Sequence, residues 1–377
     1  MAAAAEAPAA VPNHQVRNLH IDEDDEDSIL FRSLPGGSGC TIFEGTADVG
    51  VLQQSVDVAV KVFPKEWFVG RPALKRKKQI KEEYLRLRAA AEAVEGGGIC
   101  KVYGLVEDAD SWADNKQKHK MCIVMKKYDG TLMDELEEEE EEKGKKGLQL
   151  DRAVSVALSL AKTIMQLHDI GEQGILYLDL KPQNVLVDSA VGSVVLCDFG
   201  ISKVIEGTSL AATLTTAAGG GGGSGGQQAG TTNYKSPEQA GAKGEDGQLL
   251  LRSRKTDSWT FGTFLLHVLT GKVPWDGFDE AIIINELSKQ VPPPMNHLPS
   301  DTPAALVDLI KDCLKGDPDY RPTARGIMER LEVVQGQVQQ SGTAPSATAG
   351  GDVVPPAPAA ASLSSSPPTP PTPSPRA

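Results

Sequence analysis

The sequence predicts an α+β fold with a small antiparallel β lobe that carries one helix, followed by a larger helical lobe. Alternating apolar runs that favour strands crowd into the first third of the chain, and they include residues 55–63 and 121–125. Apolar runs typical of buried helices dominate from about residue 150 onward. Between these parts lies 177–200, YLDLKPQNVLVDSAVGSVVLCDFG, which is the stretch we expect the rest of the chain to support.

Composition excludes several classes of protein. A net charge of −13 argues against a general nucleic-acid-binding surface, which needs a basic footprint. The five cysteines are odd in number, widely spaced and without a C-x-x-C pair, so neither a disulfide framework nor a zinc site is predicted. No apolar run approaches the ~18 residues of a membrane span, and the Ala-rich start lacks the features of a secretory signal. We expect a cytoplasmic protein, with the nucleus as the alternative.

Composition also divides the chain. Residues 1–28 are rich in alanine and proline and then acidic, which predicts a disordered arm. Residues 29–334 carry the periodic elements of a folded domain. Residues 335–377 are rich in Pro, Ser and Thr and predict a disordered tail, in which PPTPP has the P-x-x-P spacing that suits an aromatic-lined groove on a partner protein.

The central stretch predicts a hairpin that carries a polar cluster. VLV and SVVLC are apolar runs that favour strands, and DSAVG between them favours a reversal. Asp179, Lys181 and Asn184 precede the first strand and Asp198 follows the second, so the four side chains can converge on one cleft. Two carboxylates, a cation and an amide form the set that can align a hydroxyl, neutralise a phosphate and hold Mg²⁺ through hard oxygen ligands. A capped turn would explain either half alone, but the two halves in this order favour phosphoryl transfer.

DLKPQN followed by DFG resembles the catalytic and metal-binding loops of eukaryotic protein kinases. The resemblance implies that Asp179 orients or deprotonates the substrate hydroxyl and that Lys181 contacts the transferring phosphate. It also implies that Asn184 and Asp198 bind magnesium.

The resemblance extends to a nucleotide site before the hairpin. The Gly-rich turn LPGGSGCTIFEG would cover the phosphates of ATP with Gly36, Gly37 and Gly39, although a flexible surface turn is the alternative. The VAVK strand resembles V-A-I-K, which places Ala59 and Lys61 at the nucleotide with the lysine on the α and β phosphates. A solvent-facing lysine is the alternative there.

A helix and a hinge complete the predicted nucleotide site. LKRKKQIKEEYLRLRAAAEAV has one apolar helical face, made of Ile80, Tyr84, Leu87, Ala91 and Val94. Glu83 borders this face and Glu82 points to the opposite side, so Glu83 is predicted to pair with Lys61. MCIVMKKYDGTL resembles the last strand and hinge of the small kinase lobe, which places Met125 beside the adenine and Lys127 in the hinge.

Later motifs follow in the order of the same family, namely GTTNYKSPE, DSWTFG and DPDYRPT. Arg321 in the last of them is expected to pair with Glu238, because a buried carboxylate needs a forked cation. The resemblance covers about 29–334 and implies a bilobal protein kinase-like fold. A small lobe, about 29–125, and a large lobe, about 129–334, would hold ATP and Mg²⁺ between them.

Two local predictions concern the large lobe. The acid run Glu137–Glu142 is expected to be a solvated insertion after a short helix, with a docking site for basic substrates as the alternative. Asp151 is expected to cap a helix that runs to His168, whose role we expect to be structural.

The resemblance implies an ATP-dependent kinase acting on Ser/Thr hydroxyls of protein substrates, because DLKP is typical of Ser/Thr enzymes. Glycogen-like, nucleotide or lipid substrates stay open. Leu178 stands where many kinases have an arginine that receives an activation-segment phosphate, so we do not expect control by that phosphate. The alternative is a weak or inactive pseudokinase, or a scaffold for nucleotide and protein partners. The atypical Gly-rich turn favours this alternative, and the intact polar cluster opposes it.

Overall fold

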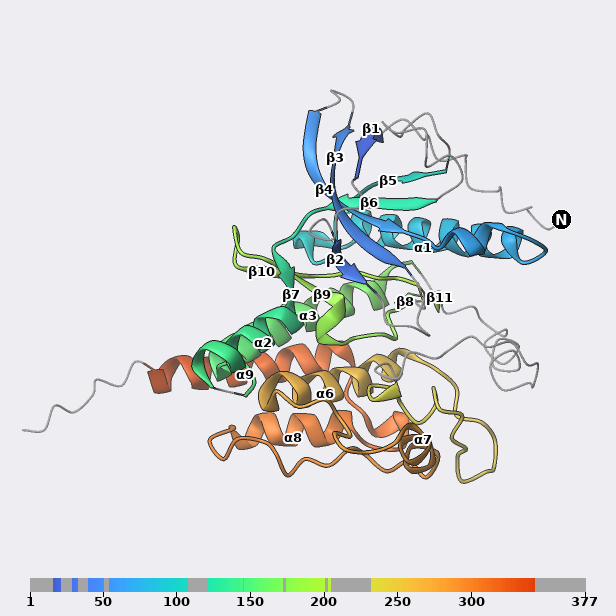
Figure 1. The fold of residues 1–377 in the computed structure, drawn as a ribbon. Coiled ribbons are helices and arrows are strands. Elements are labelled where there is room, and N and C mark those ends of the chain that lie inside the picture. The colour runs from blue at the N-terminus through green and yellow to red at the C-terminus, as the bar shows by residue number, and fades with distance from the viewer. Residues whose placement is uncertain are drawn as a thin grey trace, which may run out of the picture.

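A computed structural model describes the chain over residues 16–21, 29–32, 40–50, 54–107, 121–144, 146–171, 174–200, 203–204 and 232–342. Figure 1 shows a sheet with one long helix on one side of the molecule and a bundle of helices on the other. The predicted α+β, bilobal architecture is confirmed. Within the described part of the chain, no helix is both long and apolar enough to cross a membrane.

The small lobe is built on a six-stranded antiparallel sheet with the order β1-β3-β4-β6-β5, and β2 also pairs with β3. Its strands are β1 (Val16–His20), β2 (Ile29–Arg32), β3 (Thr41–Val49), β4 (Gln54–Val62), β5 (Val102–Val106) and β6 (Cys122–Lys126). Helix α1 (Ala73–Ala93) buries the predicted face, from Ile80 through Tyr84 to Leu87, on one side of the sheet. The other side holds a separate core in which Val58, Val60 and Val124 are fully buried, because side chains alternate across a strand.

Strand β1 covers that second face and corrects the prediction that residues 1–28 form a disordered arm. Val16, Leu19 and Ile21 are buried in the second core, so the prediction is wrong for residues 16–21. The remainder of that range before residue 29 lies outside the described residues. The sequence of β1 does not show the apolar/polar alternation of a regular strand, because Asn18 has a φ of 48° and the pairing with β3 is irregular at this point.

β1 and β2 lie along the same edge of β3, β1 on its second half and β2 on its first. The close approach of β1 depends on a glycine. A Cβ placed on Gly45 would lie 2.6 Å from the carbonyl oxygen of His20, which is too close for any side chain. The absence of a side chain at Gly45 therefore lets the end of β1 approach β3 closely at this point.

The large lobe is mainly helical. Its helices are α2 (Leu132–Lys143), α3 (Leu150–Asp169), α6 (Arg254–Thr270), α7 (Glu280–Ser288), α8 (Ala304–Cys313) and α9 (Ala324–Gly342). Figure 1 shows α6 in the middle of this lobe, and every residue from Thr256 to Leu269 is buried. A helix that is buried all round gives the lobe a rigid centre on which the functional loops can rest.

Two boundaries in this lobe differ from the predictions. Helix α3 begins at Leu150 after Gln149, so Asp151 lies in the first helical turn and does not cap the helix. A carboxylate in the first turn still stabilises the helix through its dipole. Helix α9 continues to Gly342, and Val338 packs against the core, so the predicted start of the tail at residue 335 is too early. Residues 343–377 lie outside the described residues.

The acid run is helical, which corrects the prediction of a solvated insertion after a short helix. Glu137–Glu142 belongs to α2, which starts from a reciprocal cap between Thr131 and Asp134. Glu135 accepts two hydrogen bonds of 2.8 Å from Arg152 of α3. A strong cap and this forked ion pair explain why α2 extends through a run of like charges.

The predicted hairpin is confirmed and lies between the lobes. Strand β9 (Val185–Asp188) pairs with β10 (Ser193–Leu196), and β7 (Gly130–Thr131) adds a third strand next to β9. A further short pair joins β8 (Ile175–Leu176) and β11 (Lys203–Val204). Figure 1 shows the hairpin below the sheet of the small lobe and above the helices of the large one.

Candidate active site

The loop before β9 brings three of the predicted residues into contact. The Asp179 carboxylate lies 3.0 Å from Nζ of Lys181, and the side-chain amide of Asn184 donates to the same carboxylate at 2.8 Å. Asn184 also donates to the backbone carbonyl of Asp179 at 2.9 Å. A single 3₁₀ turn, Pro182–Asn184, folds the chain back so that these bonds can form.

Helix α6 fixes the backbone just before Asp179. The carboxylate of Asp257, at the start of α6, accepts hydrogen bonds from the backbone N–H groups of Tyr177 at 3.0 Å and Leu178 at 2.7 Å. His168 lies 2.7 Å from the same carboxylate through Nε2, which supports the structural role expected for this histidine. Leu178 has a φ of 69°, a conformation that costs about 1–3 kcal/mol, and the two bonds from Asp257 hold it there.

A second ionic group joins the small lobe to the end of the hairpin. Lys61 on β4 lies 2.7 Å from Oε1 of Glu83 on α1 and 3.2 Å from Oδ1 of Asp198. Glu82 faces away and lies within 4.0 Å of Lys78 and Arg86, as the helical phase predicted. The Lys61–Glu83 contact therefore places α1 against the sheet and orients the ammonium group toward Asp198.

The surroundings of Asp179 and Asp198 shift the pKa values of the two carboxyl groups in opposite directions. Burial raises the pKa of Asp179, and the charge of Lys181 offsets only part of this effect. Burial acts on Asp198 in the same direction, but Lys61 and the N–H of Gly200 outweigh it and lower the pKa of that carboxyl. Burial would lower the pKa of Lys61, yet the nearby carboxylates of Asp198 and Glu83 hold it well above its usual value. Asp179 is thus the better proton acceptor, and Asp198 stays ionised.

Tyr177 connects the catalytic loop to the segment that carries Asp198. Its hydroxyl donates to the carbonyl of Cys197, and its ring meets the edge of the Phe199 ring at 5.3 Å. Burial strongly raises the pKa of this tyrosine, so the hydroxyl remains a donor. Asp198 between these contacts has a φ of 55°, and Tyr177 holds both of its neighbours. Sequence patterns alone predict no role for Tyr177.

The donor set fits a magnesium ion. The amide nitrogen of Asn184 is used by Asp179, so the amide oxygen is the atom available as a ligand. One oxygen of Asp198 contacts Lys61, and the side chain is 40% exposed, which makes its carboxylate accessible to a cation. Two hard oxygens and further ligands from phosphate and water match the preference of Mg²⁺.

Strands β4 and β6 bring together two residues that the sequence predicts to lie beside an adenine. Ala59 and Met125 lie opposite each other across the ladder and are buried. Lys127 in the hinge forms an ion pair with Glu44 of β3, and Lys126 lies 2.5 Å from Asp188 of β9. The hinge therefore has side-chain contacts with both lobes. Gly36, Gly37 and Gly39 lie outside the described residues.

The sequence profile of the protein kinase domain matches residues 49–331, which is most of the chain. The chain belongs to the protein kinase family. The profile begins at Val49, the last residue of β3, so β1, β2 and nearly all of β3 precede the matched region.

Curated relatives agree with the family. This kinase domain is 31% identical over 216 residues to a probable serine/threonine-protein kinase of Clostridium perfringens, covering 56% of this chain and 27% of the relative. It is 31% identical over 227 residues to a kinase of the outer chloroplast membrane from Arabidopsis thaliana, covering 59% and 32% of the two chains. A probable serine/threonine-protein kinase of Lactococcus lactis is 30% identical over 203 residues, with 54% and 27% covered. The chain thus spans about a third or less of these relatives' length.

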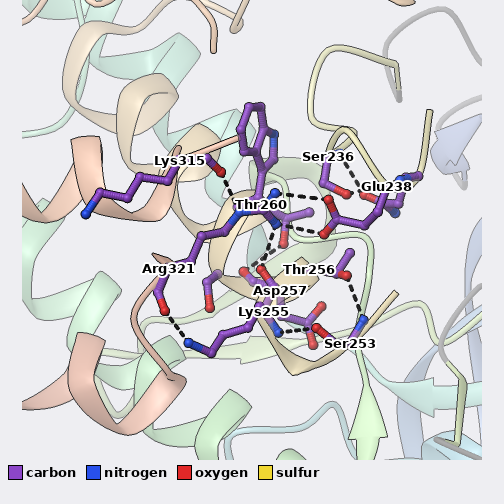
Figure 2. Close-up of polar contacts among 12 residues, drawn as sticks. Ser236, Glu238, Ser253, Lys255, Thr256, Asp257, Thr260, Lys315 and Arg321 are labelled. Carbon is purple, nitrogen blue, oxygen red and sulfur yellow. Dashed lines mark hydrogen bonds and ion pairs between the residues drawn. The ribbon is translucent and has the colours of Figure 1, made fainter. Parts of the chain in front are cut away.

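A buried ion pair secures the kinase segment that follows the hairpin. Both side chains of Arg321 and Glu238 are fully buried, and two bonds of 2.7 and 3.0 Å join them as predicted. Figure 2 shows this pair beside the start of α6, with Ser236 close to Glu238. The guanidinium also donates to the carbonyls of Lys315, Gly316 and Lys255. Every donor of the fork is thereby satisfied within the buried site.

The same segment is fixed to the catalytic loop and to α6. Gln239 donates to the carbonyl of Leu178 at 3.1 Å, and Oη of Tyr234 lies 2.6 Å from Nδ1 of His267. Burial strongly raises the pKa of Tyr234, so its hydroxyl donates and the second ring nitrogen of His267 carries the proton. That nitrogen is buried and has no partner among the described residues.

His267 should make stability depend on pH. Burial lowers the pKa of His267 to about 4, against an ordinary value near 6.5. Above pH 6.5 both folded and unfolded states hold it neutral, and as the pH falls toward 4 the unfolded state takes up the proton first. We expect the free energy of unfolding to fall by about 2 kcal/mol between pH 7 and pH 5 from this residue alone. Urea unfolding of the wild type and of His267→Gln at pH 7 and pH 5 measures this fall in the free energy of unfolding. An equal fall in the two proteins would contradict the role assigned to His267.

Proposed function

We propose that the chain is an ATP-dependent protein kinase that transfers the γ-phosphate to Ser or Thr hydroxyls of protein substrates. The observation that carries the proposal is a pair of neighbouring polar groups. Asp179 contacts Lys181 and Asn184, and Lys61 joins Asp198 to Glu83. A backbone hydrogen bond of 3.0 Å from the N–H of Cys197 to the carbonyl of Asn184 holds the two groups next to each other. This is the complete set of cations, carboxylates and amide that phosphoryl transfer requires.

Each residue receives a role from its contacts. Asp179 has a raised pKa and is free to accept or orient the proton of the attacking hydroxyl, and Lys181 beside it neutralises charge on the transferring phosphate. Asn184 and Asp198 would hold Mg²⁺ through their side-chain oxygens. ATP with Mg²⁺ supplies the phosphoryl group when bound. Lys61, held by Glu83, is suited to neutralise the inner phosphates.

The adenine would lie against Ala59 and Met125, next to the hinge that contains Lys127. We propose that Gly36, Gly37 and Gly39 cover the phosphates, because they precede β3 in the sequence and glycine permits close approach of backbone N–H groups. The same proposal includes a cytoplasmic location and protein substrates. It also includes the capture of other proteins by the Pro-rich tail.

A pseudokinase or scaffold is the second candidate, and Leu178 is the observation that favours it. Leucine has no group that binds phosphate, so the usual link between an activation-segment phosphate and Asp179 is missing at this position. Its backbone is nevertheless held in place by Asp257 and Gln239. Support for the loop therefore does not depend on an arginine, which is why we rank the active kinase first.

ATP turnover with a panel of Ser, Thr and Tyr peptides distinguishes the two candidates. We expect phosphorylation of Ser or Thr peptides by the wild type and a loss of about 10²-fold or more in Asp198→Ala. Asp308→Ala on the exposed face of α8 serves as the matched control and should keep full activity. Nucleotide binding without peptide phosphorylation in the wild type would favour the scaffold instead.

A further inference from the structure

The start of α1 carries cations and exposed apolar side chains side by side. Residues 71–81 contain six basic residues and no acidic one, although the net charge of the whole chain is −13. Figure 1 shows this end of α1, the bluer one, at the outer margin of the small lobe. The α1 basic surface, as we call it, consists of the cations Arg71, Lys75, Lys77 and Lys78 together with Val69 and Leu74.

The phase of the helix turns these side chains outward. Ile80 is buried against the sheet. Because successive residues of a helix are about 100° apart, Leu74, Lys75 and Lys78 lie on the opposite side of α1. Leu74 is 81% exposed, and the side chain of Lys78 is 78% exposed. Val69, just before the helix, is 73% exposed. Two apolar side chains therefore project among cations on the outer face of the lobe.

The turn before α1 is fixed in place. The N–H of Ala73 donates to the carbonyl of Gly70 at 3.2 Å, and Gly70 has a φ of 78°, which favours glycine. The guanidinium of Arg76 lies over the ring of Trp67, 5.1 Å from its centroid. This contact joins α1 to the 3₁₀ turn Lys65–Phe68 that precedes it. The α1 basic surface is therefore preformed, and a partner does not have to order it on binding.

Few carboxylates offset the charge of this surface. Among the described residues, no carboxylate lies within ion-pair distance of Arg71, Lys75 or Lys77. Lys78 contacts Glu82 at 3.7 Å, in an exposed pair of the kind that contributes little to stability. A partner with several anionic groups can thus bind these cations without breaking a buried interaction.

The projecting apolar side chains indicate what kind of partner this is. A protein partner binds most strongly where anchor side chains fill pockets, whereas Val69 and Leu74 project from the surface. Single-stranded nucleic acid needs exposed aromatic rings for stacking, and the Trp67 ring is partly buried with Arg76 over it. A bilayer with anionic headgroups takes up projecting apolar side chains and attracts the cations around them at the same time.

We propose that the α1 basic surface docks the protein on membranes that contain anionic lipids, without crossing them. The net charge of −13 repels the rest of the protein from the same membrane, so docking has one preferred orientation. The membrane would then lie against the helix whose Glu83 holds Lys61. Docking needs neither ATP nor phosphoryl transfer, and the inference does not rest on the proposed kinase activity.

Sedimentation of the full chain with lipid vesicles, in the absence of nucleotide, tests the docking surface. Vesicles of phosphatidylcholine alone are compared with vesicles that contain about 30% phosphatidylserine, at ionic strengths of about 0.1 M and about 0.5 M. We expect binding to the anionic vesicles only. Because salt screens exposed charges, we expect binding to be about tenfold weaker at the higher ionic strength.

Substitutions separate the contribution of charge from that of the apolar side chains. Lys75→Glu combined with Lys77→Glu should weaken binding by about tenfold or more, whereas Lys75→Arg combined with Lys77→Arg should keep it. Leu74→Ser should weaken binding by about threefold or more at unchanged net charge, and Leu74→Trp should keep it, because tryptophan suits the membrane interface. The matched control is Lys289→Glu combined with Lys311→Glu, which makes the same change in net charge at exposed lysines of the large lobe and should bind as the wild type does.

Three results would overturn the docking surface. The first is equal binding to neutral and anionic vesicles, and the second is binding to neither. The third is binding that Leu74→Ser leaves unchanged while single-stranded RNA or a polyglutamate peptide binds the same lysines as tightly, since this result would indicate a general polyanion site. Unfolding midpoints from circular dichroism show whether each variant is folded, and Arg71→Gln, outside the helix, provides a second test if a substitution in α1 destabilises it. Failure of docking would leave the proposed phosphoryl transfer standing, because no ATP is used in these measurements.

Discussion

Replacement of Asp179 by asparagine is expected to reduce kcat for peptide phosphorylation by about 10²–10⁴-fold. The amide cannot accept the proton of the attacking hydroxyl, yet its oxygen can still receive the hydrogen bond that Asn184 now donates to the carboxylate at 2.8 Å. The loop should therefore keep its conformation, and the free energy of unfolding should change by less than about 1 kcal/mol. Single-turnover kinetics and urea unfolding of the same preparation measure the two effects.

Lys61→Met should also reduce kcat strongly with little change in stability. The reason differs, because this substitution removes the cation that contacts both Glu83 and Asp198. A control is Lys162→Met on the exposed face of α3, where the lysine contacts Glu332 at 3.4 Å and solvent screens the pair. Activity of Asp179→Asn or Lys61→Met within tenfold of the wild type would reject the roles assigned to these residues. Loss of folding in either variant would instead show that the network is structural.

The largest effect on stability is expected for Arg321→Met. Glu238 would remain fully buried without its two bonds from the guanidinium, and an uncompensated buried charge costs about 3–5 kcal/mol. The carbonyls of Lys315 and Gly316 would lose their donors as well. The urea midpoint should fall accordingly, in a fluorescence or circular dichroism titration.

Arg325→Met provides the matched comparison because Arg325 is 58% exposed and pairs with Asp169 at 3.3 Å on the surface. It should change stability by less than about 1 kcal/mol. Adding Glu238→Gln to Arg321→Met should recover part of the loss, because the variant then buries a neutral amide in place of a charge. An Arg321→Met midpoint equal to that of Arg325→Met would show that the buried pair is not needed for the fold.

Local sequence patterns were sufficient to predict the elements at the centre of this molecule. The phase of α1 separates Glu83 from Glu82 because a helix places successive residues about 100° apart, and the structure follows that phase. The hairpin was predictable because its strands are buried and its turn contains the residues that reverse a chain. The pairing of Arg321 with Glu238 followed from the need of a buried carboxylate for a forked cation.

Elements that depend on tertiary contacts were not predictable in this way. β1 is short and irregular at Asn18, and only the sheet beneath it shows why its Val16 and Leu19, and Ile21 just after it, are apolar. The apolar residues at 99–100 do not extend β5, which begins at Val102, because Ile99 instead bridges to Leu196 of the hairpin. The role of Asp257 was missed because its partners, Tyr177 and Leu178, are 79 or more positions away in the sequence. A buried carboxylate at the start of an apolar helix was the available signal.

The position of β1 has a consequence for the solubility of shorter fragments. A fragment that began at β2 would leave Val58, Val60 and Val124 facing water, and the second half of β3 would become an unpaired sheet edge. Apolar patches and free strand edges promote self-association between copies of a chain. Lys61 and the later site residues would all be present in such a fragment, yet the fragment should aggregate more readily than the protein that retains Val16–His20.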